Sequence, residues 1–431
     1  METITKLQRI AELSKRDSET VCINMMCMFN KNNLWECFNM LDGKKAIGID
    51  GITKSQYEYN LCENLDDLIT RMKRMAYRPG PVKQVLIPKE GKAGATRPLG
   101  ISNLEDKIVQ KMMQRVLESM YDPTFLDCSY GFRPGKGCHD AIKDLQQHLY
   151  YNEVEAVLDV DLANFFGTID HKLLEGILRK RILDKTMMRY IIRMFKAGVL
   201  ADGDLQISDE GVPQGSICSP VLANIFAHEV IDLWVEEMVK PNCKGDVRLF
   251  RYADDFIICC RYKDDAKRIH ATLGKRLAKF NLEMNEEKTK LVLFSKKEMA
   301  QDKSQGSFDF LGFTFYLGKS RKGYIIPKVK TSGNKFRTKL KNVKEWCKQI
   351  RNRMKLSKIW KRFRSKIRGH IQYYGVSHNV DKVDEYIDRA TKILYKWLNR
   401  RSQRKSFDWE KFNKYMMKYP LEKAKVMHPL F

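Results

Sequence analysis

Residues 249–258 read LFRYADDFII, with two adjacent aspartates between two short apolar and aromatic runs. Residues 249–252 and 256–258 have the β-branched and aromatic character of strands, with no Gly or Pro in either run. The sequence therefore predicts a strand hairpin with Asp254 and Asp255 in its turn. Neighbouring ionised carboxylates repel unless a strong positive charge offsets them, and Mg²⁺ prefers oxygen ligands. An ordinary hairpin turn is the alternative, because Asp is common in turns.

A third carboxylate lies upstream, in residues 157–166, which read VLDVDLANFF. Asp159 and Asp161 alternate within an apolar run and so share one face of a predicted strand. Asp161 is nearer the carboxyl end of that strand and is better placed to reach the hairpin. Three carboxylates from two neighbouring strands can hold two Mg²⁺ ions about 3.5–4 Å apart, one activating an attacking hydroxyl and one stabilising the leaving oxygen. Phosphoryl transfer to a growing 3′ end requires this arrangement.

Eight motifs in colinear order extend this pattern over most of the chain. They are residues 50–51 (DG), 87–89 (IPK) with 97–101 (RPLGI), 129–134 (SYGFRP), Asp161 with 165–166 (FF), 211–215 (GVPQG) with 219–220 (SP), 252–255 (YADD), Asn285 with 288–290 (KTK), and 310–313 (FLGF). Together they resemble the group II intron-encoded reverse transcriptases, also called maturases, of the bacterial type that lacks an endonuclease. The resemblance implies a right-hand polymerase of the α+β class. Its fingers and palm would contain an antiparallel palm sheet flanked by helices, followed by an all-helical basic thumb, the maturase domain X.

The resemblance also implies the chemistry: RNA-directed DNA synthesis, with dNTPs added to a primer 3′ end by two Mg²⁺ ions. The implied metal ligands are Asp161, Leu162, Asp254 and Asp255. Lys288 would donate a proton to the departing pyrophosphate, and a plain surface lysine is the alternative. Phe166 would be the steric gate that leaves no room for a 2′-hydroxyl, while Phe165 is expected in the core. The family usually has Asp after this pair. Because Asp161 is retained, we expect Gly167 to affect support around the site rather than metal binding.

Nucleotide contacts are expected from the fingers and from a loop. Lys89 and Arg97 flank a flexible connector and would clamp a triphosphate, Lys as a point charge and Arg as a forked donor. Two solvated charges on a hairpin are the alternative. Residues 213–216 predict a loop that opens a helix, with its N–H groups and the Gln214 amide beside the nucleotide and template; a simple helix-entry loop is the alternative. That helix would bury apolar residues at four-residue spacing, namely Leu222, Phe226, Val230, Trp234 and Met238.

Four further residues are expected to contact template or primer: Arg133, Gly215, Leu311 and Gly312. Arg133 either touches the template backbone or pairs with an internal acid. Residues 310–313 predict a strand in which Gly312 marks a close backbone approach. By resemblance, this segment is the primer grip.

The charge distribution argues independently for a nucleic-acid partner. Residues 321–431 hold 32 Lys and Arg against 8 Asp and Glu, a balance of +24, whereas the whole chain has +26. Such a segregated positive field is typical of proteins that bind a phosphate backbone. A membrane surface is the competing partner, but no apolar run approaches the ~20 residues of a spanning helix. A core-facing helical stripe is predicted at Leu356, Trp360, Phe363 and Ile367, and a basic face at Lys355, Lys358, Arg362 and Lys366.

We expect three parts in this 431-residue chain: an N-terminal helical extension (1–50), fingers and palm (51–330), and the thumb (331–431) after a linker-like break at residues 331–334. The eleven cysteines include no CxxC, so reduced thiols are expected. The start of the chain lacks a signal or transit composition, which predicts a cytoplasmic location. After Lys330 one cysteine and three histidines remain, so no endonuclease metal cluster is predicted.

Three functional hypotheses stay open at this point. The first is a polymerase that also binds its own group II intron RNA and assists splicing and retrohoming. The second is a non-enzymatic splicing cofactor, against which the intact carboxylates argue. The third is a domesticated reverse transcriptase that serves another system, such as phage defence. The expected partners are an RNA template, a DNA or RNA primer and dNTPs, with no membrane.

Overall fold

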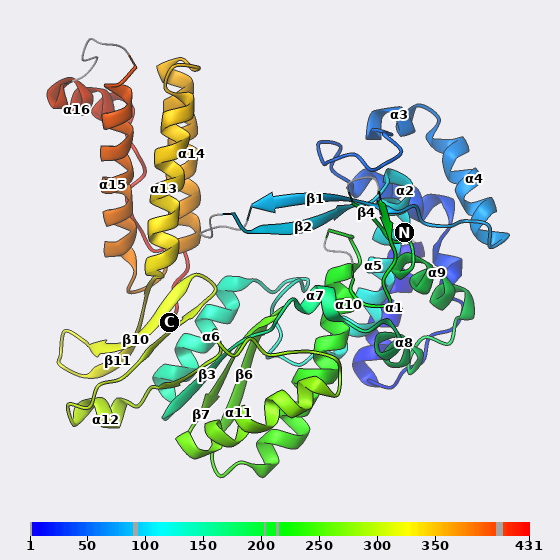
Figure 1. Ribbon diagram of the computed structural model, residues 1–431, viewed down its shortest axis with the longest axis horizontal. Helices are drawn as coiled ribbons and strands as arrows, with labels where there is room; N and C mark the ends of the chain where they lie inside the picture. The colour runs from blue at the N-terminus through cyan, green and yellow to red at the C-terminus, as the bar shows by residue number, and fades with distance from the viewer. Residues whose placement is uncertain (1, 89–93, 202–203, 213–214, 402–407) are drawn as a thin grey trace.

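The computed structural model describes residues 2–88, 94–201, 204–212, 215–401 and 408–431. Figure 1 shows a helical region carrying a projecting hairpin, a central sheet flanked by helices, and a column of long helices beside a small sheet. Helices and strands are thus mixed along the chain, as the prediction of an α+β fold requires. None of the helices in these ranges is long and apolar enough to cross a membrane.

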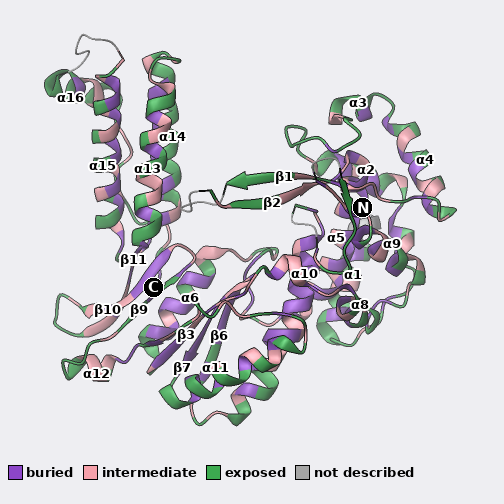
Figure 2. Cartoon of the chain, viewed as in Figure 1, coloured by how far each residue is buried: buried purple, intermediate pink, exposed green. Residues whose placement is uncertain are grey.

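The central palm sheet is antiparallel, in the order β6-β7-β3-β8. Its strands are β3 (Ala156–Asp161), β6 (Val247–Tyr252), β7 (Asp255–Cys260) and β8 (Lys290–Leu293). The two central strands, β3 and β7, are buried on both faces, which explains their short and nearly continuous apolar runs. Figure 2 shows this burial.

Successive residues of β3 enter two different hydrophobic cores. Leu158 and Val160 pack in the core that includes α11 (Lys263–Ala278). Val157 packs in the other core, with α6 (Cys138–Tyr151). Because side chains alternate along a strand, Asp159 and Asp161 share the face of Val157, as predicted.

The β6–β7 hairpin is tighter than predicted. Tyr252 pairs with Asp255, so Ala253 and Asp254 alone form the turn, and Asp255 is the first residue of β7. The prediction that both aspartates lie in the turn is therefore wrong for Asp255. Ala253 has φ +58°, and a positive φ at the first central residue is usual in two-residue hairpin turns.

A second, three-stranded antiparallel sheet lies between the palm and the thumb. Its order is β11-β10-β9, with β9 (Ser307–Phe310), β10 (Phe313–Lys319) and β11 (Ile325–Thr331). Leu311 and Gly312 form a two-residue turn with φ +49° and +81°. The prediction of a continuous strand over residues 310–313 is wrong, because positive φ at both positions makes a hairpin turn.

The fingers sheet has the order β2-β1-β4-β5, and β1 pairs with β4 in parallel. Its strands are β1 (Val82–Pro88), β2 (Thr96–Ile101), β4 (Val199–Ala201) and β5 (Asp204–Gln206). β1 and β2 project as a mostly exposed hairpin (Figure 2). In this hairpin Arg97 stands opposite Ile87.

Helices surround the base of the fingers. They are α1 (Glu2–Arg16), η1 (Met25–Met28), α2 (Lys31–Met40), α3 (Lys54–Tyr59), α4 (Leu61–Lys73), α5 (Leu104–Tyr121), η2 (Asp122–Thr124), α8 (His171–Arg179) and α9 (Lys185–Phe195). The first fifty residues form a packed helical region, as expected. They share one hydrophobic core with α5, since Leu34 and Phe38 cluster with Met112 and Val116.

Further helices complete the palm: α7 (Phe165–Thr168), α10 (Ser219–Ala227), η3 (His228–Asp232), η4 (Trp234–Val239), η5 (Lys240–Asn242) and α12 (Lys296–Ala300). The helix predicted after residue 216 therefore begins at Ser219, and after Ala227 it widens into π-helical turns. This widening breaks the four-residue spacing. Leu222, Phe226 and Val230 are buried, but Met238 is 59% exposed, so its predicted burial is wrong.

The thumb consists of α13 (Gly333–Ile350), α14 (Leu356–Tyr374), α15 (Val380–Leu398) and α16 (Trp409–Lys418). Trp360, Phe363 and Ile367 are buried along α14, as the stripe predicted. No linker precedes the thumb, because β11 ends at Thr331 and α13 begins at Gly333. Thr331 and Ser332 are buried at this junction, so the prediction of a linker-like break is wrong.

Residues 419–431 return from α16 toward the palm. Trp360 Nε1 donates to the Tyr419 carbonyl, and Gln147 of α6 donates to the Leu430 carbonyl. Phe431 packs edge-on against Tyr150. The end of the chain thereby connects the thumb to α6.

Candidate active site

The carboxylates picked out in the sequence lie around one cavity. Asp161, at the end of β3, stands opposite Asp255 of β7 in the sheet register, and Asp254 follows in the adjacent turn. The cavity measures about 400 Å³ and is lined by Asp159, Asp161, Leu162, Asp254, Asp255, Glu287, Lys288, Lys290 and Asp309. The structure thus brings all four predicted metal-site residues together. Asp309, Glu287 and Lys290 were not predicted.

Burial and neighbouring charges make three of these carboxyl groups, Asp159, Asp254 and Asp255, hard to ionise. Burial, together with the charges of Asp159, Asp254 and Asp161, raises the pKa of Asp255 to about 8. Burial, with Asp309 nearby, raises the pKa of Asp159 to about 7. Burial also raises the pKa of Asp254. A cation in the cavity would favour the ionised carboxylates and offset this repulsion.

Basic side chains partly offset these charges. Lys288 Nζ lies 2.7 Å from Asp161 Oδ1. The Arg97 guanidinium lowers the pKa of Asp254, although the effect of burial on that pKa is larger. Arg97 therefore acts electrostatically on the palm aspartates from the fingers hairpin. Its predicted partner in the clamp, Lys89, lies outside the described residues.

The side chains around the cavity suit a hard divalent cation, because such cations prefer oxygen ligands and the cavity is lined by Asp and Glu carboxylates. Within the described ranges, however, no three His, Cys, Asp or Glu side chains converge closely enough to hold a metal ion. One physical reason is visible: the carboxylate of Asp161 contacts Lys288. The chemistry of the ligands thus suits Mg²⁺, while the carboxylate of Asp161 is paired with Lys288.

Two further segments hold the aspartates in place. The Leu311 backbone N–H donates to the Asp255 carboxylate, and Tyr373 of α14 holds the Leu311 carbonyl at 2.9 Å. On the other strand, the Asn285 N–H donates to the Asp161 carbonyl at 2.8 Å. Backbone N–H groups of the motifs at residues 285–290 and 310–313 thus hold the site, in addition to the side-chain contact of Lys288.

The two consecutive phenylalanines differ in burial, and Phe166 packs against the same core in which Phe165 lies. Phe165 is 2% exposed and belongs to the core, whereas Phe166 is only half-buried. Their rings lie edge to face, 5.6 Å apart. At Gly167, a Cβ atom would lie 2.3 Å from Asn164 Nδ2, so an aspartate there would require the Asn164 side chain to move.

The loop before α10 is fixed against the fingers. Pro213 and Gln214 lie outside the described residues, so the predicted role of Gln214 stays a prediction. Gly215 has φ +109°, and a Cβ atom on it would lie 2.3 Å from the Gly100 carbonyl oxygen of β2. Only glycine permits this close approach between the loop and the hairpin.

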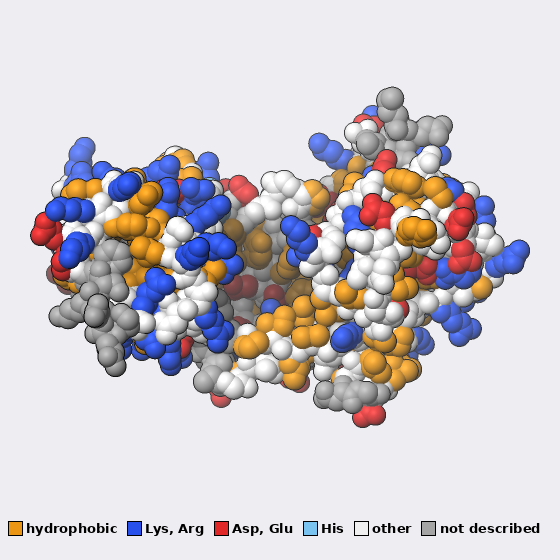
Figure 3. Space-filling view, turned by 90° about the horizontal axis from the view of Figure 1, so that it is seen from above, with side chains coloured by type: hydrophobic (Ala, Val, Ile, Leu, Met, Phe, Trp, Pro, Cys, Tyr) orange, Lys and Arg blue, Asp and Glu red, His pale blue; other side chains and the backbone are white. Residues whose placement is uncertain are grey.

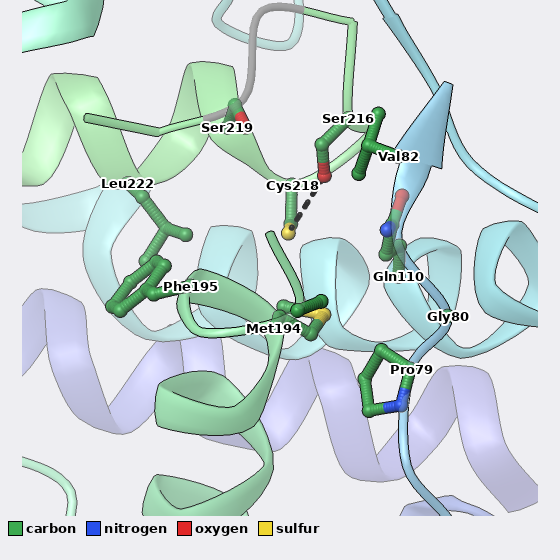
Figure 4. A pocket seen from close by; sticks show the side chains of 11 residues that line it. Pro79, Gly80, Val82, Gln110, Met194, Phe195, Ser216, Cys218, Ser219 and Leu222 are labelled. Atoms are coloured by element: carbon green, nitrogen blue, oxygen red, sulfur yellow. Dashed lines mark hydrogen bonds between the residues drawn. The ribbon is translucent and has the colours of Figure 1, made fainter. Parts of the chain in front are cut away.

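Beneath this loop, α5, α9 and α10 enclose a small pocket (Figure 4). Ser216 Oγ lies 3.5 Å from Cys218 Sγ at its upper edge, and Met194 and Pro79 line the opposite side. Its volume of about 10 Å³ matches a single water molecule. Burial raises the pKa of Cys218 to about 11, so its thiol is not a nucleophile. The pocket is a packing joint under the loop and not a substrate site.

Arg133 faces inward. Its Nε donates to Asp122 Oδ1 at 2.7 Å, its other nitrogens donate to the carbonyls of Asp122, Leu126 and Ser129, and the side chain is 7% exposed. The assignment of Arg133 to template or primer contact is corrected on this ground. The alternative prediction, that Arg133 pairs with an internal acid, is confirmed by its contact with Asp122.

A larger hollow of about 660 Å³ lies between the fingers and the N-terminal region. Besides Leu99, Gly100 and Gly215 it is lined by five lysines, Lys44, Lys45, Lys54, Lys107 and Lys111. Lys54 and Lys107 donate to backbone carbonyls of Leu41 and Ala46. This hollow was not predicted from the sequence. The adjacent Lys44 and Lys45 were a signal, but only the fold brings α5 beside them.

The thumb presents its cations to solvent. Lys355, Lys358, Arg362 and Lys366 are all exposed along α14. A groove of about 450 Å³ between α13 and α15 adds Lys344, Lys348, Lys396 and Arg400. Seen from above in Figure 3, blue side chains gather over the thumb, and acidic side chains lie on the floor of the hollow between thumb and fingers.

Comparison with known proteins places this geometry in a family. Residues 87–315, more than half of the chain, match the family described as reverse transcriptase (RNA-dependent DNA polymerase). Protein YkfC of Escherichia coli (strain K12) is 30% identical over 311 residues, which cover 65% of this chain and 78% of that protein.

Several other relatives are named after introns. The group II intron-encoded protein LtrA of Lactococcus lactis subsp. cremoris is 29% identical over 293 residues, 67% of this chain and 48% of LtrA. The putative COX1/OXI3 intron 2 protein of Saccharomyces cerevisiae is 36% identical over 199 residues, 46% of this chain and 22% of that protein. The chain thus spans about half the length of LtrA. On the extent of these matches, it belongs to the reverse transcriptase family and is an RNA-directed DNA polymerase related to group II intron-encoded proteins.

Proposed function

We propose that the chain copies an RNA template by adding dNTPs to a primer 3′ end, with two Mg²⁺ ions held by Asp161, Asp254, Asp255 and the Leu162 backbone. The meeting of these residues at one cavity, where burial and neighbouring charges raise the pKa values of Asp254 and Asp255, is the observation that supports the proposal. Bound metal would activate the attacking hydroxyl and stabilise the leaving oxygen. Reverse transcriptases use divalent metal ions and act on a template and a primer.

The chain's own residues have separate roles in this proposal. Arg97, whose charge reaches Asp254, binds the triphosphate together with Lys89. Lys288 holds a proton on Nζ, 2.7 Å from Asp161, and passes it to the departing pyrophosphate. Half-buried Phe166 excludes a ribose 2′-hydroxyl, and Gln214 contacts the nucleotide and the template strand. Gly215 and the turn Leu311–Gly312 lie against the template and primer backbones.

The basic thumb supports a second part of the proposal. The α14 face at Lys355, Lys358, Arg362 and Lys366 binds the RNA backbone, and the bound RNA includes a group II intron whose splicing and retrohoming the protein assists. The names of relatives such as LtrA favour this client. A domesticated polymerase that serves phage defence would use the same palm without an intron. A splicing cofactor without polymerase activity would use the thumb alone.

We also propose three functional parts: the extension at 1–50, the fingers and palm at 51–330, and the thumb at 331–431. The change from β11 to α13 at residues 331–333 supports the second boundary. The core shared between α2 and α5 means that the extension is packed onto the fingers.

The first test is Mg²⁺-dependent primer extension on an RNA template, comparing the intact protein with Asp254→Asn/Asp255→Asn. We expect the double variant to lose several kcal/mol of transition-state stabilisation, on the order of 10²–10³-fold or more in rate. Asp264→Asn is the matched control, because that carboxylate is 76% exposed on α11. Equal, metal-independent extension by both proteins would refute the proposed site. Inactivity of the intact protein, together with tight salt-sensitive RNA binding, would favour the cofactor function.

A further inference from the structure

The turn that carries Asp254 places an alanine at a position where hairpin turns prefer Gly, Asn or Asp. Ala253 has φ +58°, a region that residues with a Cβ adopt rarely unless their surroundings impose it. Asp254 directly follows this residue, so the conformation of Ala253 bears on the position of the Asp254 carboxylate.

Arg251, two residues before Ala253, is fully buried and makes five side-chain hydrogen bonds. Its Nε and Nη2 donate to the two carboxylate oxygens of Asp232, each at 2.6 Å. Nη2 also donates to Ser129 Oγ at 2.8 Å. Nη1 donates to Asn224 Oδ1 and to the Ala253 carbonyl, both at 3.0 Å. The guanidinium fork thus connects the turn to three other points of the palm.

The segment at residues 128–131 closes around the same turn. The Arg251 N–H donates to the Cys128 carbonyl, and the Tyr130 N–H donates to the Arg251 carbonyl. A Cβ on Gly131 would lie only 2.5 Å from the Ala253 nitrogen. Asn224 completes the ring by donating to the Gly131 carbonyl at 2.7 Å.

We propose that Arg251 is a positioning residue for catalysis, which holds the Ala253–Asp254 turn so that Asp254 presents its carboxylate to the metal. This inference rests on the proposed metal-dependent function. A buried ion pair alone is weak support for stability, since apolar residues often replace such pairs without loss. The bond to the Ala253 carbonyl is different, because it fixes a strained backbone beside an aspartate at the cavity.

The test variant is Arg251→Lys, which keeps the charge next to Asp232 but has no planar fork to reach Asn224 and Ala253 at once. We expect kcat to fall and the Mg²⁺ concentration for half-maximal activity to rise, by roughly 10–100-fold in total, the range found for groups that orient metal ligands. The KM for dNTP should stay within about twofold, since Arg251 does not line the cavity.

Arg181→Lys is the matched control. Arg181 is also buried, at 6% exposure, and donates to Ser14 Oγ, Thr124 Oγ1 and the Thr20 carbonyl. Its loss should lower the melting temperature without changing kcat or the Mg²⁺ dependence. If Arg251→Lys, like this control, lowers the melting temperature but leaves kcat and the Mg²⁺ dependence unchanged, the positioning role is refuted.

A milder variant and a second readout keep the test decisive. Ser129→Ala removes one acceptor of the Arg251 fork and should shift the Mg²⁺ requirement in the same direction, by a few-fold. Mn²⁺ binding, followed by electron paramagnetic resonance without substrate, should weaken in both variants. Unchanged Mn²⁺ affinity in the folded Ser129→Ala and Arg251→Lys proteins would overturn the inference. Equal primer extension by the unmodified protein with and without Mg²⁺ would instead refute the proposed function.

Discussion

The palm and the thumb each concentrate charge of one sign, but in opposite physical settings. In the palm, Asp159, Asp254 and Asp255 crowd one cavity, and burial and mutual repulsion raise the pKa of each. In the thumb, most of a balance of +24 over residues 321–431 lies on exposed helix faces. Water and salt screen those cations, whereas the palm carboxylates are screened far less.

This difference indicates two kinds of partner. Buried like charges favour a compact multivalent cation, and the cost of placing them is largely removed once it binds. Exposed like charges favour an extended polyanion, and binding releases counterions. The palm should therefore respond to metal and pH, and the thumb to salt.

The largest effect is expected from the thumb. Replacing Lys355, Lys358, Arg362 and Lys366 together by Gln should weaken RNA binding and lower the slope of log affinity against log salt by roughly 3–4. Fluorescence anisotropy at several salt concentrations measures this slope. The rate constant for extension of a saturating primer–template should stay unchanged, because these residues do not line the palm cavity.

Four paired cations of the thumb provide the control for that experiment. Lys382, Arg389, Lys392 and Lys414 each contact an acidic side chain three or four positions away on the same helix. Their replacement by Gln changes the net charge by the same amount but should alter the salt slope less. Equal effects of the two quadruple variants would mean that net charge, and not the α14 face, governs binding.

A smaller effect is expected from Asp255, as a dependence of stability on pH. An unfolded Asp ionises near ~3.9, whereas the pKa of Asp255 in the folded chain is raised to about 8. Between these values the folded state holds the extra proton, so stability falls as pH rises toward 8. Asp255→Asn removes this loss. Without metal, the variant should melt several degrees above the unmodified protein at pH 8 and close to it at pH 4.5.

Added Mg²⁺ tests whether the difference in melting temperature comes from the ionised Asp255 carboxylate. At pH 8 it should raise the melting temperature of the unmodified protein, because it binds the folded state, and should raise that of Asp255→Asn much less. Differential scanning fluorimetry measures both. Asp264→Asn, exposed on α11, should behave like the unmodified protein. A constant difference between Asp255→Asn and the unmodified protein at both pH values would contradict the assigned pKa.

Much of this site is readable from local patterns. The two strands around Asp254 follow from short runs rich in apolar and aromatic residues, and the shared face of Asp159 and Asp161 follows from their alternate spacing. Both signals depend only on neighbours in sequence. The α14 stripe follows in the same way from the helical period. These features needed no knowledge of long-range contacts.

Other features depend on contacts between distant segments. Arg133 could be given to the template or to an internal acid, and only the fold brings it to Asp122. Asp309 reaches the cavity because the β9–β10 hairpin docks beside β7. The inward direction of Arg251 had a faint signal, a charged residue inside an apolar strand, but its partners Asn224 and Asp232 could not be known.

The smallest effect is expected where the two charge regimes meet, at Lys288. This lysine contacts Asp161 at 2.7 Å, and both side chains are nearly half exposed, so the pair contributes no more than ~1 kcal/mol. A metal that uses Asp161 competes with Lys288 for the carboxylate. Lys288→Met should therefore tighten Mg²⁺ binding, by up to about fivefold if the full ~1 kcal/mol is released, even though the same change slows the chemical step.

Lys136→Met, which breaks a comparable pair with Asp127 away from the cavity, should leave Mg²⁺ binding unchanged. Weaker Mg²⁺ binding by Lys288→Met would mean that the lysine holds Asp161 ready for the metal instead of competing with it.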